Sequence, residues 1–396
     1  MNKMMKKIII AVAFMVTSFP LFAQYDMDDM LTSIEENNAT LKTLREEVKA
    51  QKLGNKTGIY LSNPDVEFNY LWGNPGNIGN RNDFSIKQTF DIPTLSGMKS
   101  GVANAKNQMV DLQYKSDRIK ILIEAKQLGI DLIYYNALKK ELSIRLQHAE
   151  TIASAYKERL KRGDANQLEY NKVQLNLSTV RGEMSRVDVE RGAILSELKR
   201  LNGGVDIEFD SSQYGTKSLP ANFDGWFVGA EQKNPVLQYV KEQIEVSKKE
   251  VKLNKAMGLP SFSTGYMREK TFGQSYQGLS VGISIPLWEN KNRVKQARAN
   301  VLAAEAKQYE TKQQFYDQLQ TLYMRANGLQ QTSAKYRESL TTLNNTELLT
   351  KALNAGEISL LNYILEIGLY YETVNQALSA ERDYQKAFAD LSAVEL

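Results

Sequence analysis

Hydrophobic residues in this 396-residue chain recur with two different periods along its length. In two proline-free stretches, 94–219 and 287–396, apolar residues are spaced alternately four and three positions apart. A seven-residue repeat of this kind predicts helices that pack against neighbouring helices with a left-handed supercoil. In the first stretch the repeat is carried, with one polar break at Lys139, by Leu128, Leu132, Tyr135, Leu142, Leu146, Ala149, Ala153, Tyr156 and Leu160. In the second stretch it is carried by Phe315, Leu319, Leu322, Ala326, Leu329, Ser333, Tyr336, Leu340 and Leu343.

The chain also repeats itself once, at a period of about 195 residues, which is far longer than the repeat of a solenoid protein. Each match between the two halves is short, but the matches occur in the same order. The matching segments are Asn38–Leu41 with Asn234–Leu237, Pro64–Tyr70 with Pro260–Tyr266, and Gly163–Asp164 with Gly356–Glu357. We therefore predict two copies of one structural unit.

Each copy is expected to contain a first helix, two short strands, a long helix, a glycine turn and a return helix. The predicted ranges are 27–57 and 226–257 for the first helices, 98–160 and 290–353 for the long helices, and 167–201 and 360–394 for the return helices. The first repeat then covers 24–204 and the second covers 226–396, with a linker at 205–225. Each long helix would reach roughly 90–95 Å at 1.5 Å per residue. Such helices have no globular core of their own and must pack against other helices.

Between the helical stretches, short segments alternate apolar and polar residues, which is typical of a strand with two unlike faces. The apolar positions are Val66, Phe68, Tyr70 and Trp72, then Phe84, Ile86, Phe90 and Ile92, and in the second copy Leu279, Val281, Ile283, Ile285 and Leu287. Alternation over about 8–10 residues, with Tyr and Trp near the ends, suits a bilayer-crossing β-strand. We expect Phe68, Tyr70, Phe84, Ile86, Val281 and Ile283 to face lipid. A soluble hairpin packed on helices is the alternative interpretation.

No apolar run after residue 23 is long enough for a transmembrane helix, which needs about 18 residues. Strands cross a bilayer only in a closed barrel, and single-chain barrels begin at about eight strands. Four strands per chain therefore require several chains. The predicted fold class is mainly α with a small β part: a long coiled-coil α-helical barrel, a transmembrane β-barrel shared between chains, and an internal duplication.

Residues 1–23 are predicted to be a signal peptide, with Lys3, Lys6 and Lys7 before an apolar run from Ile8 to Val16. Cleavage after Ala23 is plausible, although Leu21 is a poor match at position −3. The net charge of +4 owes three of its positive charges to this segment, so nothing argues for a nucleic-acid partner. The chain has no cysteine, so an exported form must be stabilised by packing and assembly rather than by disulfides.

With this element order, the sequence resembles the TolC-like outer-membrane efflux proteins over essentially the whole chain after residue 23. The resemblance is carried by the duplicated order of elements and by two matching motifs, RLKRGDANQLE at 159–169 and ALNAGEISLLN at 352–362. It implies a homotrimer in the outer membrane, with a twelve-stranded barrel and a twelve-helix tunnel through the periplasm. It also implies a periplasmic adaptor (a membrane fusion protein) and an inner-membrane pump as partners. Many members of the family carry a lipidated cysteine at the mature N-terminus, which this chain lacks.

In the family, the glycine motifs form the turns where the tunnel closes and the adaptor docks. The residues of this chain that match are Lys161, Arg162, Gly163, Asp164, Glu169, Gly356, Glu357 and Asn362. Glu169 matches a position where an acidic residue contributes to closure, whereas the second copy has Asn362 there. Only one acidic ring is therefore expected. Helix caps without any further role, and solvated surface charges, are the alternative interpretation of these residues.

The sequence carries no recognisable catalytic, cofactor or metal site, so no enzyme activity and no cofactor are expected. His148 is the only histidine, which excludes a histidine cluster, and we expect it on a helix surface. Asn202-Gly203-Gly204 lacks the lysine of a phosphate-binding loop.

The predicted function is a passive exit duct in the outer membrane, with a long periplasmic extension, serving efflux or type I secretion. A periplasmic coiled-coil structural or adaptor protein without a barrel is the alternative, and an exported enzyme is a more distant third possibility. The transported substrate is not encoded in any pattern of this sequence.

Overall fold

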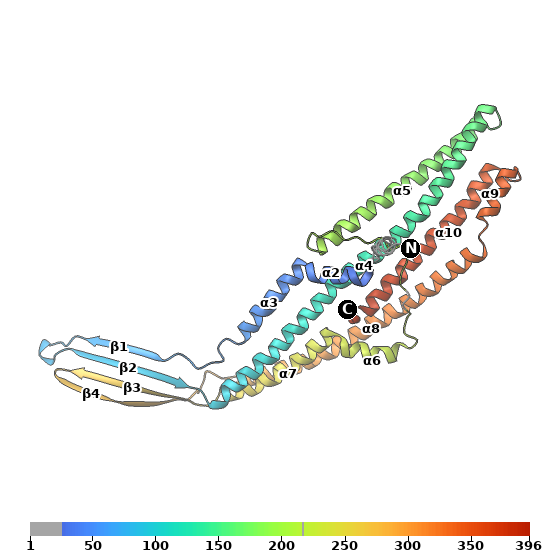
Figure 1. The fold of residues 1–396 in the computed structure, drawn as a ribbon. Helices are drawn as coiled ribbons and strands as arrows, with labels where there is room; N and C mark the ends of the chain where they lie inside the picture. The colour runs from blue at the N-terminus through green and yellow to red at the C-terminus, as the bar shows by residue number, and fades with distance from the viewer. Residues whose placement is uncertain (1–25, 216–217) are drawn as a thin grey trace, which may run out of the picture. The chain divides into compact units, whose positions relative to one another are not determined.

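The computed structural model describes residues 26–215 and 218–396, and the predicted signal peptide lies outside this range. Helices dominate, and the order of elements repeats along the chain (Figure 1). The first series is α2 (Met27–Asn37), α3 (Ala39–Asn55), β1 (Asp65–Leu71), η1 (Gly76–Ile78), β2 (Arg81–Phe90), α4 (Pro93–Arg162) and α5 (Gln167–Leu201). The second is α6 (Phe223–Lys233), α7 (Pro235–Ala256), β3 (Ser261–Thr271), β4 (Gln274–Ser284), α8 (Arg293–Thr342), α9 (Thr346–Ala355), α10 (Leu360–Leu391) and η2 (Ser392–Glu395).

The chain forms two compact units, and neither coincides with a predicted sequence repeat. The first unit comprises Met1–Asn37, Ala125–Lys217 and Thr332–Gln385. The second comprises Asn38–Glu124, Ser218–Gln331 and Lys386–Leu396. Each unit contains residues from both halves of the sequence. The helices α4, α8 and α10 each have residues in both units.

The long helix α4 is a single uninterrupted helix of 70 residues. It begins at Pro93, where a proline is favourable because the first turn of a helix leaves its N–H groups without helical partners. No proline follows within the helix, and its contour is about 105 Å at 1.5 Å per residue. The predicted long helix was therefore correct in type and short by a few residues at its N-terminal end.

The two predicted first helices are each broken into two at an asparagine. Asn38 separates α2 from α3 and Asn234 separates α6 from α7, each with an extended ψ that ends the preceding helix. The Oδ1 of Asn38 accepts a hydrogen bond from the N–H of Leu41 at 2.9 Å, and that of Asn234 accepts one from Leu237 at 3.0 Å. Both side chains are buried N-caps at matching positions of the two halves.

The second predicted long helix, 290–353, was wrong in its C-terminal part. α8 ends at Thr342 and a new helix, α9, begins at Thr346. The side chain of Asn344 accepts hydrogen bonds from both the N–H and the hydroxyl of Thr346, at 3.2 Å and 2.8 Å. This local bonding competes with the continuing helix ladder, which explains the break.

The four strands form one antiparallel sheet in chain order, and all of them belong to the second unit. Phe68 lies opposite Phe84 and Val66 opposite Ile86. Ile86 lies in turn opposite Tyr266, and Tyr266 opposite Leu279. Directly opposed residues share a face, so most large apolar side chains of the four strands occupy the same side of the sheet, with Leu71 and Met267 among the exceptions. The opposite side carries mainly small and charged residues, among them the ion pair of Arg81 with Glu269 at 3.1 Å.

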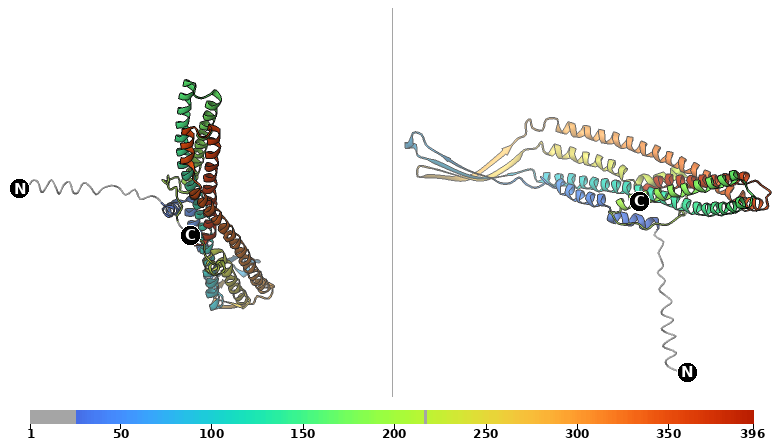
Figure 2. Two further views of the ribbon diagram at one scale, coloured as in Figure 1. Left: turned by 90° about the vertical axis from the view of Figure 1, so that its right-hand side faces the viewer. Right: turned by 90° about the horizontal axis from the view of Figure 1, so that it is seen from above.

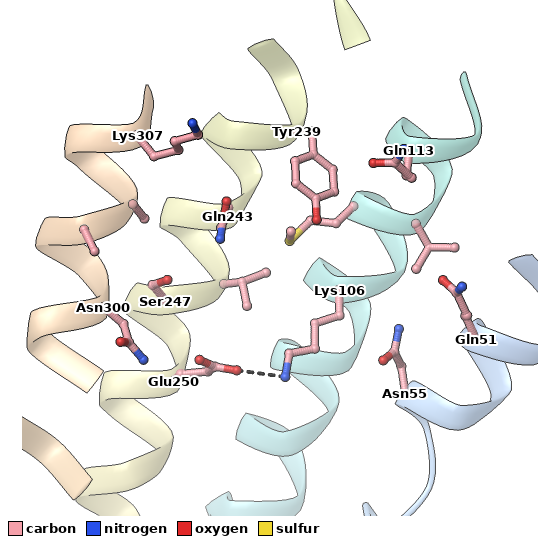
Figure 3. A pocket seen from close by; sticks show the side chains of 15 residues that line it. Gln51, Asn55, Lys106, Gln113, Tyr239, Gln243, Ser247, Glu250, Asn300 and Lys307 are labelled. Atoms are coloured by element: carbon pink, nitrogen blue, oxygen red, sulfur yellow. Dashed lines mark ion pairs between the residues drawn. The ribbon is translucent and has the colours of Figure 1, made fainter. Parts of the chain in front are cut away.

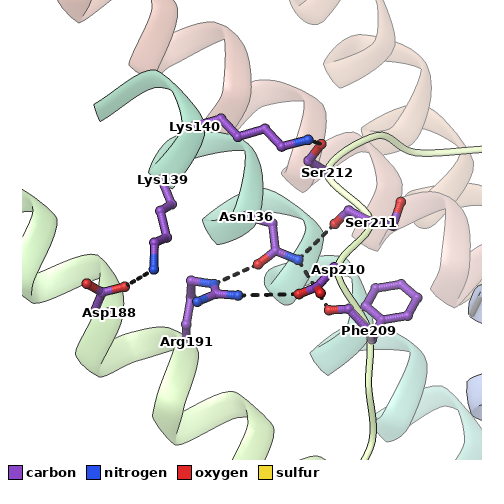
Figure 4. A network of polar contacts seen from close by, with 9 residues as sticks. All are labelled: Asn136, Lys139, Lys140, Asp188, Arg191, Phe209, Asp210, Ser211 and Ser212. Atoms are coloured by element: carbon purple, nitrogen blue, oxygen red, sulfur yellow. Dashed lines mark hydrogen bonds and ion pairs between the residues drawn. The ribbon is translucent and has the colours of Figure 1, made fainter. Parts of the chain in front are cut away.

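In the first unit, α5 returns alongside α4, and α9 and α10 follow α8 (Figures 1 and 2). The segment after α5, which includes residues 209–212, is held against these helices by side-chain hydrogen bonds and ion pairs (Figure 4). Asn136 on α4 donates to the carbonyl of Ser211 at 2.9 Å and accepts from Arg191 on α5 at 2.6 Å. The part-buried hydroxyl of Tyr214 donates to the carbonyl of Ile130 at 3.1 Å. This part of the predicted linker is therefore an ordered strap along the helices.

In the second unit, α3, α4, α7 and α8 lie side by side (Figure 2). An aromatic cluster fixes α6 onto α8, with Phe227 edge-on to Tyr316 at a ring separation of 4.9 Å. The hydroxyl of Tyr323 donates to the carbonyl of Pro220 at 2.9 Å, which holds the chain entering α6. No helix within residues 26–215 and 218–396 combines the length and hydropathy needed to cross a membrane.

Candidate functional site

The first chain reversal, residues 162–167 between α4 and α5, is closed by backbone hydrogen bonds around Gly163. The N–H of Gly163 donates to the carbonyl of Leu160 at 3.1 Å, and that of Asp164 donates to Arg159 at 2.9 Å. Gly163 has φ of +82°, in the left-handed region where a Cβ is unfavourable. A Cβ at Gly163 would meet nothing within 4 Å, so the requirement for glycine comes from the backbone conformation alone.

Glu169 has a local structural role at the start of α5. Its Oε2 accepts a hydrogen bond from the N–H of Asn166 at 3.0 Å, while the Oδ1 of Asn166 accepts one from the N–H of Glu169 at 2.9 Å. This reciprocal pair is a capping box, which satisfies two helix-terminal donors at once. Glu169 thus helps to shape the turn. Its role in closing a tunnel remains a prediction.

The charged residues around the first reversal are solvent-exposed in the single chain. Lys161 forms an ion pair with Glu158, one turn earlier on α4, at 2.7 Å. Arg159 donates to the carbonyl of Asp164 at 3.3 Å and lies over the ring of Tyr156. Exposed pairs of this kind contribute about 0–1 kcal/mol. A role of these charges in closing the tunnel remains a prediction, and so does the docking role of Arg162.

The second reversal, residues 355–360 between α9 and α10, has the same geometry. Gly356 has φ of +74°, its N–H donates to the carbonyl of Leu353 at 3.2 Å, and the N–H of Glu357 donates to Ala352 at 3.0 Å. The N-terminal cap of α10 is different, because the hydroxyl of Ser359 accepts from the N–H of Asn362 at 3.2 Å. Asn362 therefore occupies the position equivalent to Glu169 without closing a reciprocal box.

Both helix pairs share one hydrophobic core in the first unit. The core joins α4, α5 and α10 through Ala149, Ala153, Tyr156, Val173, Leu177 and Leu360. Leu360 is the first residue of α10, immediately after the second reversal. The helices that flank the two reversals therefore pack into the same hydrophobic core.

His148 lies in a part-buried polar contact between α4 and α10 rather than on the open helix surface that was expected. Its Nε2 lies 2.8 Å from the hydroxyl of Tyr363, and its Nδ1 lies 3.3 Å from the hydroxyl of Tyr371. One turn earlier, the guanidinium of Arg145 lies over the ring of Tyr371 and donates to the Tyr371 carbonyl at 3.2 Å. Burial lowers the pKa of His148 and of Arg145. No local pattern marks this site, because Tyr363 is 215 residues from His148 in the sequence.

The six residues predicted to face lipid all lie on the apolar side of the sheet. Phe68, Tyr70, Phe84, Ile86, Val281 and Ile283 are all exposed in the single chain, and Val281 is 83% exposed. The structure thus brings them together on one surface, while contact with lipid remains a prediction. Exposed apolar residues in such numbers mark a surface that normally meets another apolar phase.

A groove that sequence reasoning did not identify lies on one face of the four helices of the second unit (Figure 3). It has a volume of about 550 Å³. The lining is mixed: the uncharged polar side chains of Gln51, Asn55, Gln113, Gln243, Ser247 and Asn300 lie beside apolar ones such as Met109, Val110 and Val246. Lys106 on α4 and Glu250 on α7 form an ion pair across it at 2.8 Å.

Within residues 26–215 and 218–396, no three His, Asp or Glu side chains are grouped so that they could hold a metal ion.

Comparison with known proteins finds similarity both in sequence and in fold. No protein-family model matches the chain. The alkaline protease secretion protein AprF of Pseudomonas aeruginosa is 24% identical over 327 residues, which span 76% of this chain and 66% of AprF. The chain thus matches slightly less than two thirds of that relative's length.

Three solved structures illustrate the likeness in fold. The CmeC outer membrane channel of Campylobacter jejuni superposes with a TM-score of 0.73 at 14% identity, over 93% of this chain and 85% of CmeC. CusC superposes with a TM-score of 0.76 at 14% identity, over 94% and 92% of the two chains. The open state of the Neisseria gonorrhoeae MtrE outer membrane channel gives 0.75 at 12% identity, over 93% and 88%. The fold is therefore TolC-like, as the sequence predicted: the chain is similar in sequence to a secretion protein and in fold to outer membrane channels.

Proposed function

We propose that three copies of this chain form an outer-membrane channel that is the passive exit duct of a tripartite efflux or type I secretion system. The observation that carries the proposal is the four-stranded sheet with an exposed apolar side and a polar side. The chain provides no second layer for the apolar side within the described residues. A surface of this composition fits the lipid-facing side of a membrane strand.

The sheet is also incomplete at its edges, which argues for assembly. β1 and β4 are the outer strands, and each pairs with only one neighbour among the described strands. Unpaired backbone groups are not tolerated in the hydrocarbon region of a bilayer. Pairing of β4 of one copy with β1 of the next would close the sheet, and three copies supply twelve strands, an even number within the range of known barrels.

The helices carry unpaired apolar stripes that a second copy would cover. On α5, Leu168, Leu175 and Val189 recur at multiples of seven residues and are all strongly exposed. On α10, Leu361, Leu365 and Leu369 are likewise exposed. Apolar residues at a seven-residue spacing are typical of a helix that packs against a partner helix. The single chain therefore has the surfaces of a subunit rather than of a complete protein.

The comparisons support the same proposal. AprF is a secretion protein, and CmeC and MtrE are outer membrane channels. We extend these properties to this chain: localisation in the outer membrane, helices in the periplasm, and a periplasmic adaptor and an inner-membrane pump as partners. The proposed duct has no catalytic step, since energy and selection of cargo would come from the pump.

The proposal is tested by purifying the full chain from membranes in detergent and measuring its mass and its conductance. We expect a three-chain species after cross-linking, and discrete conductance steps in a planar lipid bilayer. A monomer of full helical content that stays in the soluble periplasmic fraction and conducts nothing would instead support the coiled-coil adaptor without a barrel.

A further inference from the structure

We propose that the contact of His148 with Tyr363 and Tyr371 is a proton-operated latch between α4 and α10, released when the imidazole becomes charged. The inference concerns a site in the first unit and goes beyond the proposed function. His148 is the only histidine of the chain, so one side chain would carry the response. Imidazole is also the side chain whose ordinary pKa lies between pH 5 and 8.

The hydrogen bonds fit a neutral imidazole. Tyr363 is only 1% exposed, and its hydroxyl lies 2.8 Å from Nε2 of His148. With the tyrosine as donor, Nε2 must be the unprotonated acceptor, and Nδ1, which lies 3.3 Å from both hydroxyls, then carries the hydrogen and donates to Tyr371. Protonation at Nε2 turns this acceptor into a donor, so the Tyr363 hydroxyl must turn to accept and its own hydrogen loses this partner.

The phenols themselves stay neutral over the same pH range. Burial raises the pKa of Tyr363, and burial raises the pKa of Tyr371 to about 12. Neither tyrosine can therefore supply a negative charge to a protonated His148. Of the three residues in the contact, the imidazole alone changes its charge near neutral pH.

The surroundings already hold one buried cation. Arg145, one turn from His148 on α4, is 4% exposed, and its Nε has no hydrogen-bond partner. Charged and titratable groups that act on Arg145 come from α4, α5 and α10, and they are Glu141, Glu183, Tyr371 and Glu372. Tyr363 also bonds to the side chain of Thr350 on α9. For His148 itself, desolvation is the one influence that stands out, and it disfavours the charged form.

The sign of the pH dependence follows from linkage. In the closed contact, burial lowers the pKa of His148, whereas in an opened contact the imidazole regains its ordinary pKa of about 6.5. The opened form therefore binds the proton first as the pH falls. The closed contact between α4 and α10 therefore has its full stability above about pH 6.5 and loses stability as the pH falls below that value.

Release of this latch would act on both reversals. Tyr363 lies in α10, seven positions after Gly356 of the second reversal. His148 lies next to Ala149, which belongs to the core that both helix pairs share. Opening between α4 and α10 loosens that core, while the capping bonds of each turn remain intact. Movement is thus expected between the two helix pairs rather than within either turn.

The test uses two spin labels, because the chain contains no competing cysteine. Thr151→Cys on α4 and Glu366→Cys on α10 are introduced into the full chain at exposed positions. Distances are measured in detergent by pulsed dipolar spectroscopy at about pH 8 and about pH 5, the limits of imidazole titration. We expect a second, longer distance population that is absent at pH 8 and present at pH 5.

The matched control is His148→Gln, which keeps a polar side chain that cannot titrate, with His148→Leu as a second variant if the first does not fold. The control should show the same single population at both pH values. The proposal would be overturned if the labelled protein that keeps His148 gave identical distance distributions at both pH values. It would also be overturned if the control showed the same pH response. A chain that forms no channel would count against the proposed function and leave the distance result standing.

Discussion

At the residue scale, the chain uses glycine where the backbone of each reversal must be left-handed. Gly163 has φ of +82° with nothing within 4 Å of the position that a Cβ would occupy, whereas Gly182 lies within α5 and is equally free of neighbours. The two glycines therefore differ in backbone conformation and not in available space. That difference gives opposite expectations for the same substitution.

Gly163→Ala should weaken the first reversal, and Gly182→Ala should strengthen α5. A Cβ in the left-handed conformation costs roughly 1–2 kcal/mol, while alanine inside a helix is favoured over glycine by roughly 0.5–1 kcal/mol. Hydrogen exchange is the measurement: the amides of Gly163 and Asp164, which close the turn, should exchange faster in the first variant only. Equal exchange at these amides in Gly163→Ala would contradict the strained-turn interpretation.

Glu169 has two separable roles, one demonstrated and one predicted. Glu169→Gln keeps a side chain that completes a capping box but removes the charge, whereas Glu169→Ala removes both. If the carboxylate helps to close the proposed channel, single-channel conductance should rise in both variants, while exchange of the Asn166 amide should rise only in Glu169→Ala. Normal conductance in Glu169→Gln would leave this residue as a helix cap alone.

At the element scale, the sequence predicted the types and order of the helices and strands but not the interruptions within the helices. The heptad spacing and the absence of proline were sufficient for α4, because both are properties of long stretches. A break at one residue leaves little trace in such patterns. Asn234 followed by Pro235 was a usable signal, since Asn is a favoured N-cap and Pro a favoured first helical residue. Asn38 has no proline after it, and only its equivalence to Asn234 could have revealed the first break.

The surfaces were predicted less completely than the elements. The alternation in 66–72 and 279–287 was enough to assign the apolar side of the sheet, because strand periodicity fixes which residues share a face. The contact of His148 and the groove were missed, since both depend on which helices pack together. Pairing of α4 with α10 brings together residues from the two halves of the chain, and no local pattern encodes it.

The matching N-caps can be tested against a helix start that lacks one. Asn38→Ala and Asn234→Ala should each lower the free energy of unfolding by about 1 kcal/mol, because the N–H of Leu41 or of Leu237 loses its acceptor. Asn345→Ala is the control, since Asn345 precedes α9 without a side-chain capping bond. Chemical denaturation should separate the first two variants from the third. Equal stability of all three would remove the capping explanation for the helix breaks.

The two sides of the sheet should respond differently to the same charge. Ile283→Lys places an ammonium group on the apolar side, at a cost of about 2–4 kcal/mol if the position lies near the centre of a bilayer. Ser284→Lys is the matched control, because the next residue of β4 lies at almost the same depth on the polar side. The fraction of heat-modifiable oligomer on an unboiled gel should fall in the first variant and stay normal in the second. Normal assembly of Ile283→Lys would argue against lipid contact.

At the scale of the whole molecule, a single chain leaves the sheet edges unpaired and the helix stripes uncovered. These two observations are independent, since β1 and β4 belong to the second unit and α5 to the first. Each alone is compatible with some other partner. Together they favour copies of the same chain, because a closed ring of identical subunits would satisfy edges and stripes at once.

The stripe on α5 provides the last test of this assembly. Leu175 is 68% exposed in the single chain, and its seven-residue spacing from Leu168 predicts that it is buried between copies. Leu175→Glu would place a carboxylate in that apolar contact, whereas Asn176→Glu, at the next and partly exposed position of α5, would place it about 100° further round the helix. We expect chemical cross-linking in detergent to give fewer three-chain species for Leu175→Glu and a normal yield for Asn176→Glu, with equal helical content by circular dichroism. A normal trimer yield in Leu175→Glu would show that this stripe faces something other than a second copy, and the case for the homotrimer would then rest on the sheet edges alone.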